Sequence, residues 1–203
     1  MSKFLQDNFW KSNFGNLYTK RNNKKLEIKS LNIHFKEVLS DMLGNNINSV
    51  FEFGTNRGLN LDIIKRLNKN ISTNGLEINK MAYKLASKKH NILHMSALEY
   101  MPKKKYDLVI TRVFLIHIHP KNLDAIYKKI FETSKKYIYI GEYFNPTPVE
   151  VNYRNNSNVL FKRDFAKELV KKYKLKLIKY GFNWSEDRKK PTLDNTNWFL
   201  FKK

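Results

Sequence analysis

Short apolar stretches alternate with helical patterns through most of this 203-residue chain, and this alternation limits the fold more than any other feature. The stretches with the character of buried strands are residues 49–53, 75–78, 92–95, 106–111 and 137–142. Patterns with helical spacing follow at residues 59–67, 80–88, 123–134 and 163–172. Strands that alternate with helices of about ten residues predict a parallel sheet with helices on both faces.

The two ends of the chain depart from this alternation. Two strand patterns, residues 175–182 and 198–201, close the chain without a helix between them, so they should be antiparallel neighbours. Residues 1–25 are polar with spaced aromatics and should form a helical or irregular segment, while residues 31–43 have helical spacing and end at Gly44. We therefore expect an α/β fold with a seven-stranded, mostly parallel sheet and an antiparallel C-terminal hairpin. The length fits a single domain over residues 1–203.

The composition argues against some classes of function for this chain but does not identify one. The net charge of +21 comes from 32 Lys and 7 Arg against 18 acidic residues. A basic field attracts nucleic acid, but these lysines are spread along the whole chain, and forked contacts to phosphates and bases favour arginine. An A/T-rich genome would also produce a chain rich in Lys, Asn and Ile without any ligand. We therefore expect a diffuse solvated surface, and a nucleic-acid partner is not expected.

The chain has no cysteine, which excludes disulfides, thiolate metal sites and a cysteine nucleophile. No metal is expected. The longest apolar runs are far too short to cross a bilayer, and the first residues show no apolar signal-peptide core. These features predict a cytoplasmic protein with no membrane partner, and they leave the oligomeric state open.

The junction after the first strand carries the clearest binding signal. Residues 49–53 run directly into a G-x-x-x-G segment, residues 54–58, and then into a helix. Glycines allow a tight turn and a close approach of the backbone to a ligand. Glu77 ends the second strand 23 positions after the first glycine, which is the spacing of an acid that binds ribose hydroxyls. By itself, the glycine pattern suits an ordinary strand-to-helix turn equally well.

Glu52 lies two residues before the first glycine and distinguishes this segment from a dinucleotide-binding site. Its carboxylate can receive the ammonium group of a methionine moiety. The combination with Glu77 predicts a Rossmann-like class I methyltransferase fold that binds S-adenosyl-L-methionine and releases S-adenosyl-L-homocysteine. The expected cofactor-binding residues are Glu52, Gly54, Thr55, Asn56, Arg57, Gly58, Glu77, Ile78, Ser96, Ala97 and Arg112, with Tyr18 and Arg21 from the N-terminal segment.

The N-terminal aromatics Trp10, Phe14 and Tyr18, together with Arg21, are expected to form a helical lid within residues 1–30. A lid keeps water from a sulfonium group and strengthens the electrostatics of the site. The alternative is a helix that simply docks on the edge of the sheet.

Several segments also resemble the methyltransferases associated with pseudaminic acid biosynthesis, a bacterial nonulosonate-sugar pathway. The resemblance covers nearly the whole chain and is carried by residues 8–22, 52–61, 75–79, 115–120, 142–154 and 160–165. The most specific part is Asn145-Pro146-Thr147-Pro148-Val149-Glu150-Val151, while His119 stands where the family usually has an asparagine. The resemblance implies the same fold and cofactor, and a sugar-like acceptor.

The acceptor should lie near the ends of the fourth and fifth strands. The candidates for catalysis are His117, His119, Glu142 and Tyr143, with His117 as the first choice for a general base because its ordinary pKa suits proton exchange near neutrality. Alternatively, the two histidines belong to a loop in which one caps the next helix, and Glu142 is a structural carboxylate paired with Arg112 or Arg154.

Residues 143–160 form a long polar segment stiffened by two prolines, as expected of a substrate-binding insertion. The expected substrate-binding residues are Asn145, Glu150, Tyr153, Arg154, Arg163 and Trp10. We therefore expect an S-adenosylmethionine-dependent methyltransferase that modifies, at oxygen or nitrogen, a small anionic or sugar acceptor such as a nonulosonate or a nucleotide-linked sugar. The alternatives are an RNA or other nucleic-acid methyltransferase, or a basic binding protein without catalysis on the same fold.

Overall fold

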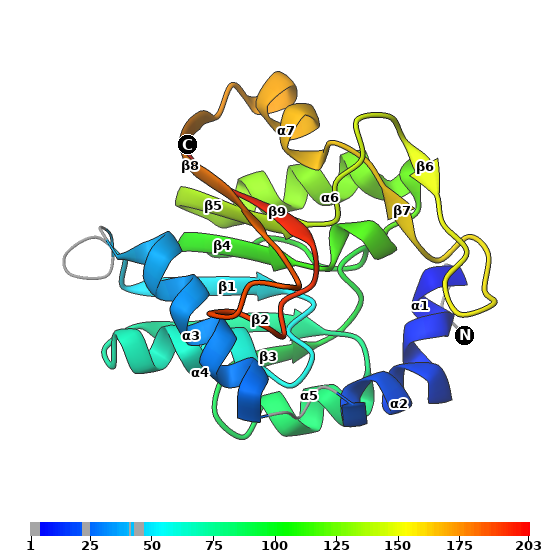
Figure 1. Ribbon diagram of the computed structural model, residues 1–203, viewed down its shortest axis with the longest axis horizontal. Coiled ribbons are helices and arrows are strands. Elements are labelled where there is room, and N and C mark those ends of the chain that lie inside the picture. Colours follow the sequence, from blue (N-terminus) through cyan, green and yellow to red (C-terminus); the bar gives the residue numbers. More distant parts are fainter. Residues whose placement is uncertain (1–4, 22–24, 41, 43–46) are drawn as a thin grey trace.

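The computed structural model describes residues 5–21, 25–40, 42 and 47–203, and a seven-stranded sheet runs through its centre (Figure 1). The order of the strands is β3-β2-β1-β4-β5-β9-β8. Neighbours from β3 to β5 are parallel, and β9 is antiparallel to both β5 and β8. The expectation of a mostly parallel sheet with an antiparallel C-terminal pair is confirmed. The strands are β1 (Ser49–Phe53), β2 (Ser72–Glu77), β3 (Asn91–His94), β4 (Tyr106–Arg112), β5 (Ser134–Glu142), β8 (Lys176–Asn183) and β9 (Thr196–Lys202).

Helices cover both faces of this sheet. Buried side chains of α3 and α4 pack on one face, and those of α6 and α7 pack on the other. No helix in the described part of the chain has both the length and the apolar character needed to span a membrane. The helices are α1 (Leu5–Lys11), α2 (Asn13–Arg21), α3 (Lys25–Leu39), α4 (Leu59–Leu67), α5 (Lys80–Ala86), the 3-10 turn η1 (Leu115–His117), α6 (Pro120–Thr133) and α7 (Phe165–Tyr173).

The alternation of side chains along β4 explains why the central strands read as continuous apolar runs. Leu108 and Ile110 belong to the core beneath α3 and α4, while Val109 belongs to the core beneath α6 and α7. A parallel strand covered on both faces must be apolar at successive positions. The same alternation continues to the end of each strand, and it decides on which face of the sheet a polar residue at that end will lie.

Some element boundaries differ from the sequence expectation. Helix α6 begins at Pro120, three residues early, because the Nδ1 atom of His119 accepts a hydrogen bond from the N–H of Lys121 at 3.2 Å and the proline occupies the first turn. Helix α3 starts earlier than residue 31 and ends at Leu39. The expected stop at Gly44 lies outside the described residues. The two-residue strands β6 (Val149–Glu150) and β7 (Phe161–Lys162) were not expected, since they are too short to show a pattern.

The order of the sheet reverses between β1 and β4. Strand β1 pairs with β2 on one side and with β4 on the other, so the connections leave the carboxyl end of the sheet in opposite directions. In open α/β sheets a ligand crevice forms at such a point. Helices α1 and α2 lie at this end of the sheet, on the right of Figure 1.

Candidate functional site

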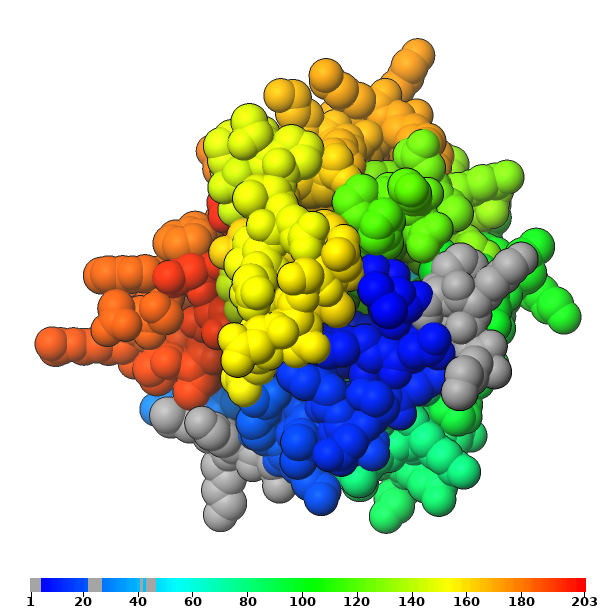
Figure 2. All heavy atoms as spheres, turned by 90° about the vertical axis from the view of Figure 1, so that its right-hand side faces the viewer, coloured from blue at the N-terminus to red at the C-terminus, as the bar shows by residue number. Residues whose placement is uncertain are grey.

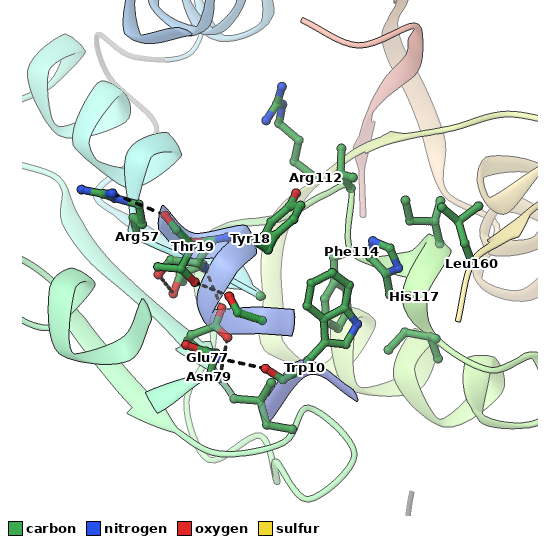
Figure 3. A pocket seen from close by; sticks show the side chains of 18 of the residues that line it. Trp10, Tyr18, Thr19, Arg57, Glu77, Asn79, Arg112, Phe114, His117 and Leu160 are labelled. Carbon is green, nitrogen blue, oxygen red and sulfur yellow. Dashed lines mark hydrogen bonds between the residues drawn. The ribbon is translucent and has the colours of Figure 1, made fainter. Parts of the chain in front are cut away.

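A cavity of about 1010 Å³ lies at the carboxyl ends of β1, β2 and β4. Its wall combines the loops after these strands with α1, α2 and the segment that follows β5 (Figure 3). Cavities that hold a drug-sized ligand measure roughly 300–1,000 Å³. This cavity is therefore large enough for a nucleoside-sized molecule and a second small ligand together.

The first four residues of the glycine loop, which spans residues 54–58, form one wall of this cavity. Gly54 and Gly58 have φ angles of 71° and 80°, in the left-handed region where a Cβ atom is costly. The N–H groups of Gly54 and Thr55 both donate to the Leu76 carbonyl at 3.0 Å. These bonds hold the loop against the end of β2.

Gly75 makes this close approach possible. A Cβ atom built on Gly75 would overlap the Thr55 side chain and would lie 2.6 Å from the Glu52 carbonyl oxygen. Since that oxygen belongs to the backbone of β1, it cannot move aside cheaply. The glycine therefore sets the spacing between β2 and the start of the glycine loop.

Glu77 connects the glycine loop to the start of α5. Its carboxylate accepts hydrogen bonds from the N–H groups of Asn56 and Asn79, both at 2.7 Å. Burial raises the pKa of Glu77, while the backbone hydrogen bonds oppose that rise. Glu77 lines the cavity, and each carboxylate oxygen has a further lone pair with which it can accept a hydrogen bond from a ligand.

Asn79 fastens the N-terminal helices to this site, a role that the sequence analysis did not anticipate. Its Oδ1 atom accepts from the N–H of Ala82 at 3.0 Å and so caps α5. Its Nδ2 atom donates to the Trp10 carbonyl and to Oδ1 of Asn16, both at 3.0 Å. An asparagine directly before a helical pattern is a recognisable cap signal, but its bonds to residues more than sixty positions away are not.

Helices α1 and α2 lie across the cavity. Nη1 of Arg57 donates to the Thr19 carbonyl at 3.4 Å, and Nε2 of Gln6 donates to the Asn158 carbonyl at 2.8 Å. Figure 2 shows these N-terminal helices in blue against the yellow segment that follows β5. Residues of both helices line the cavity, namely Gln6, Asp7, Trp10, Gly15, Tyr18, Thr19 and Arg21.

Glu52 does not line the cavity, although its spacing suggested contact with a ligand. It is 1% exposed, and its Oε1 atom accepts from Nδ2 of Asn60 at 2.6 Å. Burial raises the pKa of Glu52 to about 8, against the lowering effects of Asn60 and Arg112. Its side chain lies on the α3 and α4 side of β1, behind the glycine loop. Gly58 also lies outside the cavity lining and serves as the N-terminal cap of α4.

The end of β4 carries a strained residue at the cavity wall. Val113 has a φ angle of 52°, and its N–H donates to the Gly141 carbonyl at 2.8 Å. A β-branched residue adopts this conformation at a cost of roughly 1–3 kcal/mol, and such strain gathers at functional sites. The neighbours Arg112 and Phe114 line the cavity as well.

Five residues of the cavity wall present buried polar atoms that have no partner in the described part of the chain. They are Nε1 of Trp10, Oδ1 of Asn56, Oδ1 of Asn60, Nε of Arg112 and Oγ1 of Thr192. Buried polar groups are nearly always hydrogen-bonded in folded proteins. These atoms therefore identify places where a bound ligand or water would complete the hydrogen bonding.

His117 lies in the cavity wall with a defined tautomer. Its Nδ1 atom is 2.9 Å from the Val159 carbonyl oxygen, and because a carbonyl only accepts, Nδ1 carries the hydrogen. Burial lowers the pKa of His117 to about 4, although the bond to Val159 acts in the opposite direction. The ring therefore stays neutral near pH 7 and has a lone pair on Nε2. The Trp10 ring packs edge-on against it, with the centroids 4.5 Å apart.

His119 and Glu142 have structural surroundings instead of positions in the cavity wall. His119 caps α6, as the alternative interpretation of the histidine pair supposed. The Glu142 carboxylate accepts from the N–H groups of Phe114 and Leu115 at 3.0–3.1 Å, so it holds the turn after β4. Its pKa rises to about 7 through burial, and these hydrogen bonds oppose the rise. No ion pair joins it to Arg112 or Arg154 among the described residues.

The segment after β5 divides into a part that lines the cavity and a part that does not. Tyr143, Tyr153 and Arg154 line it. Burial and a hydrogen bond to Asp194 raise the pKa of Tyr143, and the Arg154 guanidinium lies 5.8 Å from the centre of the Tyr153 ring.

The other expected substrate residues have partners elsewhere. Asn145 closes a local turn through the Thr147 carbonyl at 2.6 Å. Glu150 accepts from the N–H of Asn158 at 2.5 Å, and Arg163 pairs with Glu168 at 2.8 Å.

The remaining expected cofactor residues lie together. The residues Thr55, Asn56, Arg57, Ile78, Ser96, Ala97, Arg112, Tyr18 and Arg21 all line the cavity. Sequence reasoning missed other lining residues, including Thr19, Phe114, Leu160, Thr192 and Asp194. The loop that supplies Thr192 and Asp194 precedes β9 and has no motif. Only its return to the carboxyl end of the sheet brings it to the site.

Comparisons with known proteins give a structural likeness and no sequence match. No model of a known protein family matches the sequence, and no curated protein matches it. Among solved structures, magnesium protoporphyrin IX methyltransferase from Synechocystis PCC 6803 with bound SAM matches with a TM-score of 0.72 and 10% identity over 100% of both chains. A SAM-dependent methyltransferase from Archaeoglobus fulgidus matches with a TM-score of 0.65 and 17% identity over 94% of this chain and 100% of that one.

A third solved structure is also similar over most of its length. The 1,6-didemethyltoxoflavin-N1-methyltransferase of Burkholderia thailandensis matches with a TM-score of 0.69 and 10% identity over 98% of this chain and 87% of that one. At such low identity the likeness establishes the fold. This chain has the Rossmann-like fold of class I SAM-dependent methyltransferases, as the sequence analysis expected.

Proposed function

We propose that this chain is an S-adenosylmethionine-dependent methyltransferase acting on a small acceptor. The observation that carries the proposal is the position of Glu77, which lines a large cavity at the point of strand reversal while holding the glycine loop through Asn56. The shared fold with SAM-dependent methyltransferases supports it. The whole chain would act as one catalytic domain, with residues 1–30 as its lid and residues 143–160 on the acceptor side.

The residues around the cavity fit this cofactor. Glu77 would accept hydrogen bonds from the ribose hydroxyls, and Ser96 with Ala97 would face the adenine. The unpartnered Oδ1 of Asn56 and Nε of Arg112 would meet polar groups of the same molecule or of the acceptor. Bound S-adenosylmethionine supplies a methyl group on a sulfonium that is already activated for in-line displacement.

His117 is the residue that we propose as proton acceptor. Val159 holds its Nδ1 hydrogen, so Nε2 is left with the lone pair that can accept a proton from an acceptor hydroxyl or amine. Burial keeps the ring neutral, since the pKa is lowered to about 4. Trp10 and Tyr153, whose rings pack against His117, would orient the acceptor and exclude water.

The proposed acceptor is an anionic or sugar-like molecule, such as a nonulosonate or a nucleotide-linked sugar. Cationic side chains in the cavity wall support an anionic acceptor, namely Arg112, Arg154 and Lys162. The sequence resemblance in residues 142–154 supports a sugar. The net charge of +21 keeps a second candidate open, namely a nucleic-acid acceptor.

Transfer of a radiolabelled methyl group separates these candidates. The protein is incubated with labelled S-adenosylmethionine and either the small-molecule fraction of a bacterial extract or its total RNA, and Glu77→Ala serves as the inactive control. We expect label in an anionic small molecule, with transfer reduced at least about tenfold in His117→Asn. Label in RNA alone would contradict the small-molecule acceptor and favour the nucleic-acid acceptor. Label in neither fraction would contradict the proposed methyltransferase activity.

A further inference from the structure

The cavity extends over both faces of the sheet, and its lining differs between them. On the face covered by α6 and α7 the lining is largely apolar and aromatic, and it includes Phe114, Ile116, Ile118, Val151, Tyr153 and Leu160. On the face covered by α3 and α4, Leu31 and Leu59 line the cavity and pack in the other core. We call this second part the α3-side arm, and its polar lining residues are Asn60, Arg112 and Thr192.

Three separate parts of the chain supply these polar residues. Asn60 lies in the first turn of α4. Arg112 stands two residues after Ile110, which packs beneath α3 and α4, so its side chain leaves β4 on the same face. In Figure 3 this side chain extends away from His117. Thr192 precedes Leu193, which is buried in the same core.

Each of the three residues has a buried polar atom without a partner in the described part of the chain. These atoms are Oδ1 of Asn60, Nε of Arg112 and Oγ1 of Thr192. An amide oxygen only accepts hydrogen bonds, a guanidinium only donates them, and a hydroxyl can do either. An amino acid offers the complementary groups, because its ammonium group donates and its carboxylate accepts. The α3-side arm therefore suits the amino-acid end of S-adenosylmethionine.

Glu52 orients Asn60 within this arm. Nδ2 of Asn60 donates to Oε1 of Glu52 at 2.6 Å, so Oδ1 is left as the atom that can accept from a ligand. Burial raises the pKa of Glu52 to about 8, the hydrogen bond from Asn60 and the charge of Arg112 oppose this rise, and the charge of Glu77 adds to it. A cation bound at Asn60 would favour the charged form of Glu52.

We propose that the α3-side arm binds the amino-acid end of the cofactor. Asn60 accepts a hydrogen bond from its ammonium group, and Arg112 and Thr192 donate to its carboxylate. Glu52 is a positioning residue that acts through Asn60. The apolar part of the cavity beside His117 is then left for the acceptor. This inference rests on the cofactor of the proposed function.

Calorimetry with two ligands tests the assignment. S-adenosylhomocysteine carries the amino-acid end, and methylthioadenosine is the same thioether without it. The natural chain should bind S-adenosylhomocysteine at least about tenfold more tightly than methylthioadenosine. Asn60→Ala and Thr192→Val should each weaken S-adenosylhomocysteine at least about tenfold and leave methylthioadenosine unchanged. Asn122→Ala, in the first turn of α6 and outside the cavity lining, is the matched control and should change neither affinity.

The two ligands also separate the possible failures. Valine keeps the shape of threonine, so Thr192→Val should fold like the natural chain even if Asn60→Ala does not. Equal changes in the affinities of both ligands in Thr192→Val, or no change in either, would overturn the proposal. A natural chain that binds neither ligand would contradict the proposed function itself.

Proton release gives a second measurement of the role of Glu52. Near pH 7, binding of S-adenosylhomocysteine should release a proton, so the heat of binding should depend on the ionisation enthalpy of the buffer. Methylthioadenosine, which has no ammonium group, should release none. Glu52→Gln keeps an oxygen that can accept from Asn60 and should bind S-adenosylhomocysteine without release. Release that persists in Glu52→Gln, or is absent from the natural chain, would contradict the role of Glu52.

Discussion

Two buried carboxylates that a sequence spacing assigned to one ligand have different surroundings in the folded chain. Glu77, the last residue of β2, lines the cavity and accepts from the N–H of Asn56, while Glu52 lies further back along the sheet in β1 and accepts from Asn60 of α4. The position of a residue at a strand end is predictable from the sequence. The register of β1 and β2 places both carboxylates on the same face of the sheet, so whether each side chain reaches the cavity depends on how far along the strand it stands and on what packs against it.

The histidines show the same limit at the residue scale. The pattern placed His117 and His119 after the fourth strand, and both lie there. The 3-10 turn η1 rotates the first toward the cavity and leaves the second as the cap of α6. A turn of three residues has no periodicity from which such a rotation could be read.

The buried ring of His117 should make stability depend on pH. Its pKa is about 4 in the folded chain and 6.5 ordinarily, so between these values the unfolded chain binds a proton that the folded chain does not. Protonation of the unfolded chain therefore does not lower the free energy of unfolding above about pH 6.5, and it lowers that free energy progressively as pH falls toward 4. Between pH 7 and pH 5, the free energy of unfolding measured with urea should fall by about 2 kcal/mol more for the natural chain than for His117→Asn. His94→Asn, at an exposed ring, is the control, and equal losses in natural chain and His117→Asn would refute this account.

At the scale of elements, the central strands and helices could be predicted because each repeats a pattern over several residues. The N-terminal aromatics predicted helices near the cofactor end of the sheet, and α1 and α2 line the cavity. The hydrogen bonds that hold these two helices in place could not be predicted. Asn79, Arg57 and Asn158 reach them from three separate parts of the chain.

Asn79→Ser should loosen the attachment of α1 and α2, the proposed lid, without unfolding α5. Serine is also a good helix cap, so the bond to the Ala82 N–H would be replaced. The donors to Trp10 and Asn16 would be lost, at roughly 1 kcal/mol each. Hydrogen exchange of residues 5–21 should accelerate at least about fivefold, while α6 provides the internal reference. Unchanged exchange in residues 5–21 would show that these bonds do not hold the lid.

At the scale of the whole molecule, the sheet order follows from the alternation of elements, but the two unequal edges do not. The strand pattern at residues 175–182 has the same appearance whether or not another strand covers it. Likewise, the charge of +21 is a property of the whole surface, and the sequence does not tell how much of it faces the cavity.

The salt dependence of binding should distinguish a ligand held by the diffuse basic surface from a ligand held in the cavity. If the lysines form only a general basic surface, binding to a random RNA oligomer should weaken at least about tenfold between about 50 and 200 mM salt. Binding of S-adenosylhomocysteine in the cavity should change less than about threefold over the same range. Fluorescence anisotropy for the RNA and calorimetry for the small ligand give both numbers. A steep salt dependence of both would place the basic surface within the site.

Titration calorimetry with S-adenosylhomocysteine tests the central claim most directly. The natural chain should bind one molecule per chain, and Glu77→Ala should bind it at least about thirtyfold more weakly, because a buried charge-assisted hydrogen bond is worth about 2 kcal/mol or more. Glu132→Ala, at an exposed helix position, should bind like the natural chain. Absence of binding to the natural chain would contradict the cofactor site itself, and equal affinity in Glu77→Ala would contradict the role of Glu77 in it.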